Sequence, residues 1–176
     1  METLSKRIHD ITVRSSRVLI DEVLKPSGQK SQRVVINFPN TVAMIPLLKP
    51  DMFILVKQYR YALQRETLEF PAGKVDLSET LEMAVHRELL EETGYNAKIL
   101  KKVYDFAPAM GYSTEICHLY FVTDLEKDLN AKINQEEISK IEIKSKKELW
   151  SEIQSGRIQD PDIVIGFLLC EKLNLI

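Results

Sequence analysis

The chain has 176 residues, of which 44% are hydrophobic and 28% charged, a composition typical of an ordinary soluble globular domain. Its 24 Lys and Arg residues against 26 Asp and Glu residues leave a net charge of -2. No broad basic face is therefore expected, which argues against nucleic acid as a partner. The longest apolar run, residues 163–170, is too short to span a bilayer, and we expect neither a signal segment nor a membrane partner.

The first 40 residues are expected to form a small β extension before a main domain over residues 41–176. Residues 11–24 are rich in β-branched side chains, and the turn signal "KPSGQ" separates them from the apolar run "RVVIN". This pattern predicts an antiparallel hairpin, or two short ones. Isolated two-stranded pieces are marginal in water, so the extension must pack on something.

The next apolar runs predict a hairpin at the centre of a sheet. "TVAMIPLL" (41–48) and "MFILVKQYRY" (52–61) are almost continuously apolar and are separated by a short turn. Such runs are typical of strands that are buried on both faces. "ETLEF" (66–70) predicts a further short strand, which leads the chain into the loop "PAGK".

One helix is predicted over residues 81–93, where Thr80 can cap its start and Gly94 can end it in a left-handed conformation. The later elements are expected to be strands at 100–106, 116–125 and 140–144, with helices at 146–155 and 161–173. The mixture lacks a regular βαβ rhythm, so we expect a mixed α/β (α+β) sheet with helices on both faces. Trp150, and the tyrosines outside loop 107–115, are expected in the core.

The two cysteines, Cys117 and Cys170, stand in a chain long enough to build a core without disulfides. This favours two buried thiols in a reducing, cytoplasmic setting.

The predicted helix carries three carboxylates on about one turn. Glu88 and Glu92 lie on the same side as the apolar residues Ala84 and Val85, and Glu91 is next to them. Carboxylates four residues apart repel by about 0.2–0.5 kcal/mol, and burying them costs more. A hard divalent cation such as Mg²⁺, which binds oxygen ligands, would offset that cost. The alternative is an acidic helix face that is simply solvated.

The spacing around these carboxylates is G-x5-E-x7-R-E-U-x-E-E-x-G-U, where U is a bulky apolar residue. The fixed positions before the last are filled by Gly73, Glu79, Arg87, Glu88, Leu89, Glu91, Glu92 and Gly94. This stretch resembles the Nudix hydrolase box. Tyr95 stands where an aliphatic residue is usual, and we interpret it as a packing residue.

The resemblance implies a Nudix-like α/β/α sandwich that hydrolyses a nucleoside diphosphate linked to another moiety. It implies Mg²⁺ as the cofactor, with Mn²⁺ as a substitute. By position, Glu88, Glu92 and the backbone carbonyl of Ala72 are the expected metal ligands. Glu91 is expected to be a further ligand or to orient water, and Arg87 to hold the glutamates in place.

The flanks, strongest over residues 54–123, resemble the ADP-ribose pyrophosphatases. In "KQYRY", Arg60 is expected near the substrate phosphates, or else as a surface cation at a strand end. Glu69, just before "PAG", belongs to the metal shell or pairs with a lysine. Glu115, in "APAMGYSTE", contacts substrate or caps a strand. The general base is expected in the loop "NQEEISKIEI", where Glu136 is favoured over Glu137, unless both only solubilise the loop.

The same resemblance implies a homodimer in which the N-terminal strands help to close the partner's substrate pocket. Arg33 would reach the partner's nucleotide, or else it is a solvated cation at a strand edge. The expected reaction is Mg²⁺-dependent hydrolysis of ADP-ribose to AMP and ribose 5-phosphate. Another nucleotide sugar, such as GDP-mannose or ADP-glucose, is the alternative substrate. A non-catalytic ligand-binding module is a remote alternative, because the chain keeps every glutamate of the box.

Overall fold

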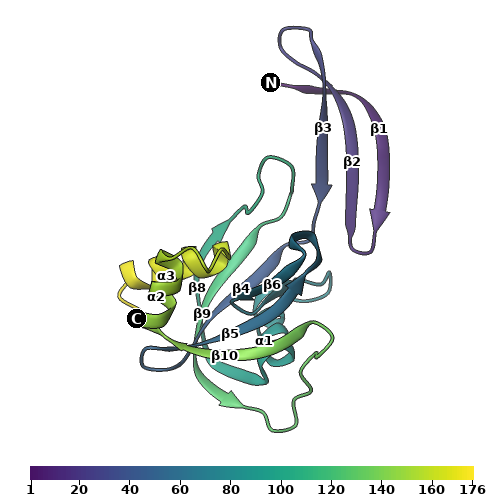
Figure 1. The fold of residues 1–176 in the computed structure, drawn as a ribbon. Coiled ribbons are helices and arrows are strands. Elements are labelled where there is room, and N and C mark those ends of the chain that lie inside the picture. Colours follow the sequence, from purple (N-terminus) through teal and green to yellow (C-terminus); the bar gives the residue numbers. More distant parts are fainter. The chain divides into compact units, whose positions relative to one another are not determined.

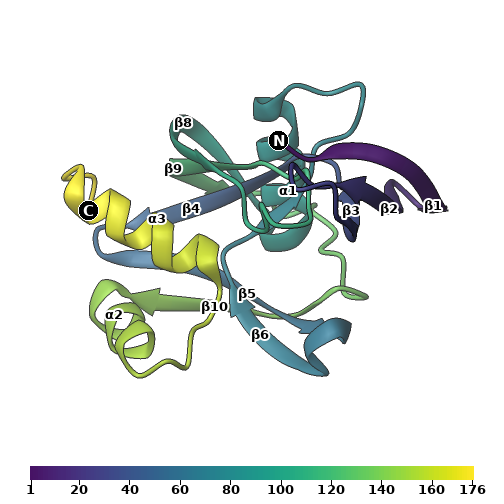
Figure 2. The same ribbon diagram turned by 90° about the horizontal axis from the view of Figure 1, so that it is seen from above.

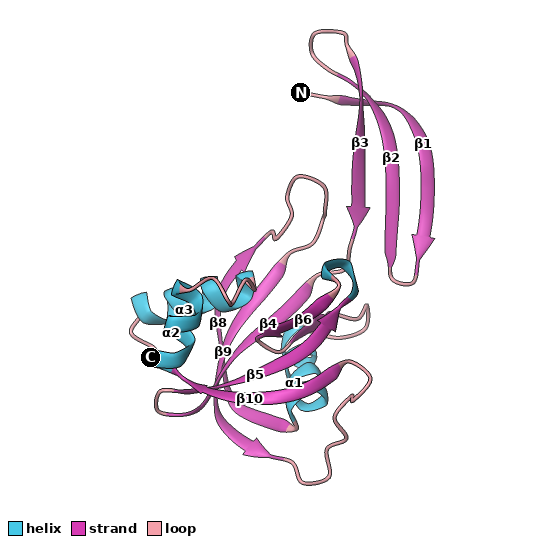
Figure 3. Cartoon of the chain, in the orientation of Figure 1, coloured by secondary structure: helices cyan, strands magenta, loops and turns pink.

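The computed structural model describes residues 1–176 and divides into two compact units (Figure 1). The first unit comprises residues 1–41 together with residues 106–117, and the second comprises residues 42–105 and 118–176. The loop predicted at residues 107–115 of the main domain thus clusters with the N-terminal strands. Figure 3 separates the helices of the chain from its strands by colour.

The first unit is built on an antiparallel sheet in the order β1-β2-β3. Its strands are β1 (Thr3–Val13), β2 (Ser16–Leu24) and β3 (Lys30–Asn37). The predicted hairpin is therefore a three-stranded sheet, whose first strand begins well before residue 11. Strand β1 pairs with β2 through two register shifts, between Leu4 and Lys6 and between Arg7 and His9. These shifts disturb the period-2 alternation by which a strand is recognised, so β1 was missed.

The second unit contains a seven-stranded sheet and three helices. The strands are β4 (Thr41–Lys49), β5 (Met52–Arg60), β6 (Arg65–Glu69), β7 (Ala72–Lys74), β8 (Tyr95–Phe106), β9 (Cys117–Lys127) and β10 (Ile138–Ser145). The helices are α1 (Leu81–Thr93), α2 (Lys146–Gln154) and α3 (Pro161–Lys172), with a 3₁₀ turn η1 (Tyr61–Leu63). Turn η1 and strand β7 were not anticipated, and β8 begins five residues earlier than predicted.

The main sheet has the order β10-β5-β4-β9-β8, with β6 beside β5 and β7 beside β4. Strands β4 and β5 form the predicted central hairpin, and both are inner strands. Their apolar runs, residues 42–46 and 53–56, are buried. Asp51 turns the chain between them with a φ of 61°.

Alternating residues of β4 show that both faces of this sheet are covered. Met44 packs in one buried cluster with Ala84, Val85 and Leu89 of α1. Ile45, the next residue along the strand, meets α3, because a Cβ added at Gly166 would lie 2.8 Å from its Cδ1. Helices α1 and α3 therefore lie on opposite faces (Figure 2), which confirms the predicted layered α/β architecture.

Helix α1 has the predicted ends. The Thr80 hydroxyl accepts a hydrogen bond from the Met83 N–H, and Gly94 ends the helix with a φ of 75°. The Gly94 N–H donates to the Leu90 carbonyl at 2.9 Å. Local sequence alone therefore determines where this helix begins and ends, and so where its carboxylates lie.

The prediction for the aromatic side chains is partly wrong. Tyr120 is buried, but Tyr59, Tyr61 and Tyr104 are exposed. Trp150 is 40% exposed and stacks on Phe167. Strand ends and short turns carry the exposed tyrosines, where the ring can lie along the surface with its hydroxyl in water.

Cys117 and Cys170 are both buried and are not joined in a disulfide, as expected. Among the helices of the chain, none has the length and apolar character needed to cross a membrane.

Replacing Gly94 by alanine is expected to destabilise the protein by about 1–2 kcal/mol, because the left-handed conformation brings a Cβ too close to the backbone. The measurement is urea unfolding followed by circular dichroism. Gly111→Ala is the matched control: Gly111 has no positive φ and open space where a Cβ would be added. The control should change stability by less than about 0.5 kcal/mol. Equal effects of the two substitutions would contradict the proposed conformational role of Gly94.

Candidate active site

Glu92 is the most buried acid of helix α1. It is 6% exposed, and one of its oxygens, Oε2, accepts a hydrogen bond from the Ala72 N–H at 3.0 Å. Burial raises the pKa of Glu92 to about 8, although the Ala72 N–H and the nearby Arg60 favour the charged form. The Glu92 carboxylate is therefore held where ionisation is costly unless a further positive charge is present.

Glu88 lies one turn earlier on the same helix and is also partly desolvated. Burial raises its pKa, and the hydrogen bond and positive charge of Arg87 oppose that rise. The Glu88 carboxylate packs directly against the backbone of Gly73. A Cβ added at Gly73 would lie 1.9 Å from its carboxyl carbon, so only glycine leaves room for it.

Arg87 joins the helix to the loop before it. Its Nη2 contacts Glu79 Oε1 at 2.5 Å and donates to the Lys74 carbonyl at 2.8 Å. Its Nη1 contacts Glu88 Oε1 at 2.6 Å and lies 3.5 Å from Glu91. The distance from Arg87 to Glu91 is thus longer than those to Glu79 and Glu88. The Glu79 hydrogen bond is the largest cause of the raised pKa of Arg87.

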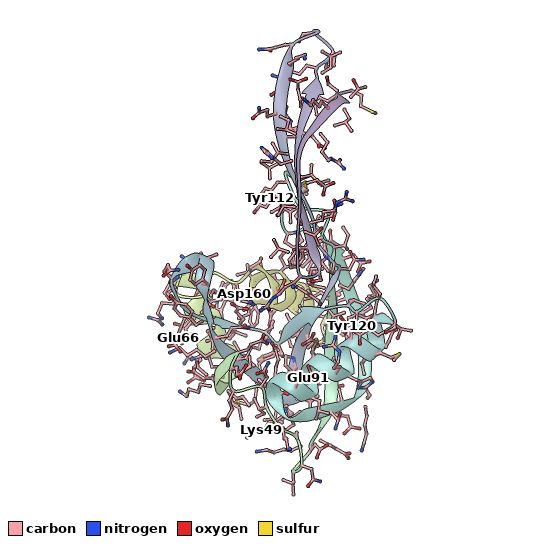
Figure 4. All side chains as sticks on the ribbon, turned by 90° about the vertical axis from the view of Figure 1, so that its right-hand side faces the viewer. Lys49, Glu66, Glu91, Tyr112, Tyr120 and Asp160 are labelled. Atoms are coloured by element: carbon pink, nitrogen blue, oxygen red, sulfur yellow. The ribbon has the colours of Figure 1, made fainter.

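Glu91 is the exposed member of the glutamate group, with a side chain 52% accessible (Figure 4). It lies at the helix surface beside the two desolvated acids. A carboxylate in this place is open to water as well as to a cation.

Glu69, at the end of β6, is paired with arginine and not with lysine. Arg60 Nε donates to its Oε1 at 2.8 Å, and Arg60 Nη2 contacts its Oε2. Gln58 and Thr67 also donate to the same carboxylate. Glu69 is 8% exposed, so this bidentate pair lies at the edge of the protein interior.

The pair of Arg60 and Glu69 opens onto a cavity of about 500 Å³. The cavity is lined by η1, by β6 and by the segment before α3, and its cationic residues are Lys57, Arg60, Arg65 and Arg157. The same lining carries four acids, Glu66, Glu69, Asp160 and Asp162, so the formal charge of the cavity is balanced. Its polar, concave lining suits a ligand that carries both charged and hydrogen-bonding groups. A second cavity, of about 560 Å³, lies beside Trp150 and Phe167 and shares no lining residue with the first.

The donor set fits a divalent metal ion, although no three His, Cys, Asp or Glu side chains converge as a preformed metal cage. The oxygens of Glu88 and Glu92 are the hard donors that Mg²⁺ prefers. Both carboxylates are desolvated, and a cation between them would remove the cost of their ionisation. Magnesium sites commonly use only one or two carboxylates, with water and phosphate completing the shell.

Glu136 and Glu137 lie on an exposed turn before β10. This turn follows a loop that is bonded to the end of α1: the Asn134 N–H donates to the Glu91 carbonyl at 3.1 Å, and the Asp128 N–H donates to the Gly94 carbonyl. Both glutamates thus belong to a segment that is anchored on the helix with the carboxylates.

Arg33 and Glu115 belong to the first unit. Arg33, whose side chain is 41% exposed, forms an ion pair with Glu2 at 2.5 Å, and Glu115 accepts a hydrogen bond from the Thr41 hydroxyl at 2.9 Å. Their role as substrate contacts stays a prediction.

The sequence reasoning missed Asp160. This residue lines the same cavity as Arg60 and Glu69, and its carboxylate accepts a hydrogen bond from the Phe70 N–H at 3.2 Å. The dipeptide Asp160-Pro161 is a recognisable start of a helix, but its link to a residue 90 positions earlier has no sequence signal.

The NUDIX domain family model matches residues 37–164, and the chain belongs to the Nudix family. The methanol dehydrogenase activator of Bacillus methanolicus is 34% identical over 165 residues, which cover 92% of this chain and 89% of that protein. The ADP-ribose pyrophosphatase of Bacillus subtilis is 38% identical over 106 residues, covering 60% of this chain and 57% of that protein. The predicted resemblance to this subgroup is thereby confirmed.

A solved structure described as an ADP compounds hydrolase has the same fold, with a TM-score of 0.80 at 19% identity, covering 98% of this chain and 93% of that one. Family membership together with the ADP-ribose pyrophosphatase relatives makes the chain a pyrophosphohydrolase of the Nudix family. Nudix hydrolases generally use divalent metal ions, which agrees with the donor set on α1.

Replacing Gly73 by alanine is expected to lower hydrolytic turnover by roughly 10–100-fold, because the new Cβ displaces the Glu88 carboxylate. In a Glu88→Gln background the same substitution should add little, since both changes act on one group. The measurement is steady-state turnover of all four proteins, with circular dichroism as the control for folding. Additive losses in the double variant would contradict the assigned contact.

Proposed function

We propose that the protein hydrolyses the diphosphate of ADP-ribose, with Mg²⁺ as cofactor and Mn²⁺ as a substitute, so that ADP-ribose and water give AMP and ribose 5-phosphate. The observation that carries this proposal is the pair of desolvated carboxylates, Glu88 and Glu92, on consecutive turns of α1. The choice of ADP-ribose is supported by the similarity to the Bacillus subtilis enzyme, and Arg60 in the cavity offers a cation for its diphosphate.

The metal ligands in this proposal are Glu88, Glu92 and the Ala72 carbonyl, joined by Glu91 or Glu69. Arg87 bonds Oε1 of Glu88 and the Ala72 N–H bonds Oε2 of Glu92, so we assign the second oxygen of each carboxylate to the metal. A divalent ion bound there supplies a Lewis acid for the diphosphate and lowers the pKa of a bound water.

Arg87 keeps this arrangement in place before substrate arrives. Its bonds to Glu79 and to the Lys74 carbonyl fix the loop that precedes α1, while its bond to Glu88 fixes a ligand. Because Arg87 balances part of the negative charge of the glutamates, the site can hold several acids close together without a metal. Catalysis benefits from such groups being oriented in advance.

The attacking water needs a base, and three glutamates are candidates. Glu91 is exposed on α1 and suits either the orientation of water or a place in the metal shell. Glu136, favoured over Glu137, lies on the turn next to the loop that is bonded to the end of α1, and we assign it as the general base. A base on a segment anchored to the catalytic helix can reach a water that is held by the same helix.

Arg60 is assigned to the substrate phosphates. Its side chain is 46% exposed and lines the cavity, while Glu69 holds the guanidinium through a bidentate pair. Glu69 thus orients Arg60, and this role stands beside its possible place in the metal shell. The same cavity suits GDP-mannose or ADP-glucose, which present a diphosphate of the same charge, and these remain the alternative substrates.

The experiment that tests this function is a panel of sugar nucleotides with Mg²⁺, in which AMP and ribose 5-phosphate are identified as products.

Glu92→Gln and Glu88→Gln are each expected to lose about a hundredfold or more in turnover, because a metal ligand is lost. Both changes are isosteric and remove a buried charge, so thermal stability should hold or rise. Near-normal turnover of both variants at saturating Mg²⁺ would refute the metal assignment. A non-catalytic module would give no product from any member of the panel.

We also propose a twofold homodimer that is formed through residues 1–40, with the substrate pocket closed in trans. Leu4, Ile11, Val13 and Val34 of the N-terminal sheet are each about half exposed or more, which leaves apolar area to be covered. Arg33 would leave Glu2 to contact the partner's nucleotide, and Glu115 would contact substrate from its own loop. A closed dimer of this kind uses the same surface on both subunits.

Mixing two inactive variants tests the shared site. When Arg33→Ala and Glu92→Gln subunits exchange, one site of each heterodimer carries both defects and the other carries neither. Activity should therefore recover beyond that of either parent. A monomer in sedimentation, or no recovery after proven exchange, would reject the site in trans and leave the catalytic assignment intact.

A further inference from the structure

The segment from Glu69 to Gly73 brings three parts of the proposed site together. It contributes the Glu69 side chain, the Ala72 carbonyl and the Gly73 backbone against which Glu88 packs. A shift of this segment relative to α1 would therefore move two proposed ligands and displace a third. The groups that hold the segment determine the geometry of the site.

Besides the bonds to the Glu69 side chain and the strand pairings of β6 and β7, three hydrogen bonds hold the segment, and each goes to a different element. The Ala72 N–H donates to Glu92 of α1, and the Pro71 carbonyl accepts from the Met44 N–H of β4. The Phe70 N–H donates to Oδ2 of Asp160 at 3.2 Å. Pro71 has no N–H to offer. The Asp160 contact is thus the one that ties the segment to the C-terminal part of the chain.

Asp160 performs two tasks with two oxygens. Its Oδ1 accepts from the Asp162 N–H at 3.2 Å and so caps helix α3, while Oδ2 holds Phe70. A cap alone does not need an aspartate, because serine, threonine or asparagine serves equally well. An aspartate offers two acceptor oxygens in a fixed fork, whereas asparagine offers one acceptor and one donor.

Asp160 lies in a place where the ionisation of a carboxylate costs free energy. Desolvation is the main reason that the pKa of Asp160 lies well above its usual range, and the charges of Asp162 and Glu69 add to it. Phe70, whose N–H it holds, is fully buried and packs against Phe53. The Asp160 carboxylate therefore connects the buried core at Phe70 to the edge of the cavity that Arg60 and Glu69 also line.

We propose that Asp160 is a positioning residue, which sets the Glu69–Gly73 segment against α1 through the Phe70 N–H and thereby sets the affinity of the site for its divalent ion. This inference rests on the proposed function, because it assigns the ion to Glu88, Glu92 and Ala72. Residues that do not touch the metal but orient its ligands are important for binding. Removing one typically lowers metal affinity or activity by about 10–100-fold.

The test compares Asp160→Asn with the charge-matched control Asp51→Asn in the full chain. Asp51 is exposed, does not line the cavity of Arg60 and Glu69, and has a φ of 61°, which asparagine tolerates. At position 160, asparagine keeps the cap of α3 but presents a donor to one of the two N–H groups. Mn²⁺ binding is measured by the loss of the free-ion signal in electron paramagnetic resonance, and Mg²⁺ activation by turnover of ADP-ribose. We expect the Mn²⁺ dissociation constant and the half-saturating Mg²⁺ concentration to rise about tenfold or more in Asp160→Asn. Both should stay within about twofold of wild type in Asp51→Asn.

A second measurement stays informative if Asp160→Asn folds poorly. In the wild-type protein the Phe70 amide should exchange slowly with solvent, and in Asp160→Ser, which keeps a cap, it should exchange faster. Unchanged metal affinity in both Asp160 variants, with only a lower melting temperature, would show that the residue is no more than a cap and overturn the inference. Wild-type protein that binds Mn²⁺ but does not hydrolyse ADP-ribose would refute the proposed function alone. Wild-type protein that binds no Mn²⁺ would overturn both.

Discussion

The buried carboxylate of Glu92 is the constraint on which the arrangement of the second unit depends. An acid that is 6% exposed requires a hydrogen-bond donor, and the Ala72 N–H supplies it. That bond and the bond of Arg87 to the Lys74 carbonyl hold β7 beside α1, and β7 in turn pairs with the central strand β4. Strands β4 and β7 and helix α1 therefore meet at the Glu92 carboxylate, and the protein balances the charge of that carboxylate only in part. A site for a cation follows from the packing itself, before any ligand is considered.

Arg87 offsets the repulsion between the clustered carboxylates in the folded protein. Acids one turn apart on a helix repel, and two of them, Glu88 and Glu91, surround Arg87 together with Glu79. The guanidinium fork satisfies several carboxylates at once, which a point-charge ammonium could not do with the same geometry. Arg60 does the same for Glu69 on the neighbouring strand. Each arginine thus holds an acid of the proposed site in a fixed place and offsets the cost of its desolvation.

The parts of the fold that local chemistry determines could be predicted from the sequence. Thr80 and Gly94 bracket α1 by capping, and the spacing of the box places Glu88 and Glu92 on the side that packs against the sheet. Long-range partners could not be predicted, because nothing near Glu69 in the sequence specifies Arg60 over a lysine, and nothing near Phe70 specifies Asp160. Strand β1 escaped for a different reason, since its register shifts remove the alternation on which strand prediction depends.

Those register shifts have a consequence for behaviour in solution. A three-stranded sheet has two edges, and a flat, apolar edge is a template on which further chains can add strands without limit. The edge at β3 is engaged by the chain itself, because Ile36 exchanges hydrogen bonds with Tyr112 and Thr114. The edge at β1 is irregular and carries Lys6 and Arg7 next to its two bulges. Irregular, charged edges resist open-ended stacking, so the irregularity that hid β1 from prediction also protects the protein against aggregation.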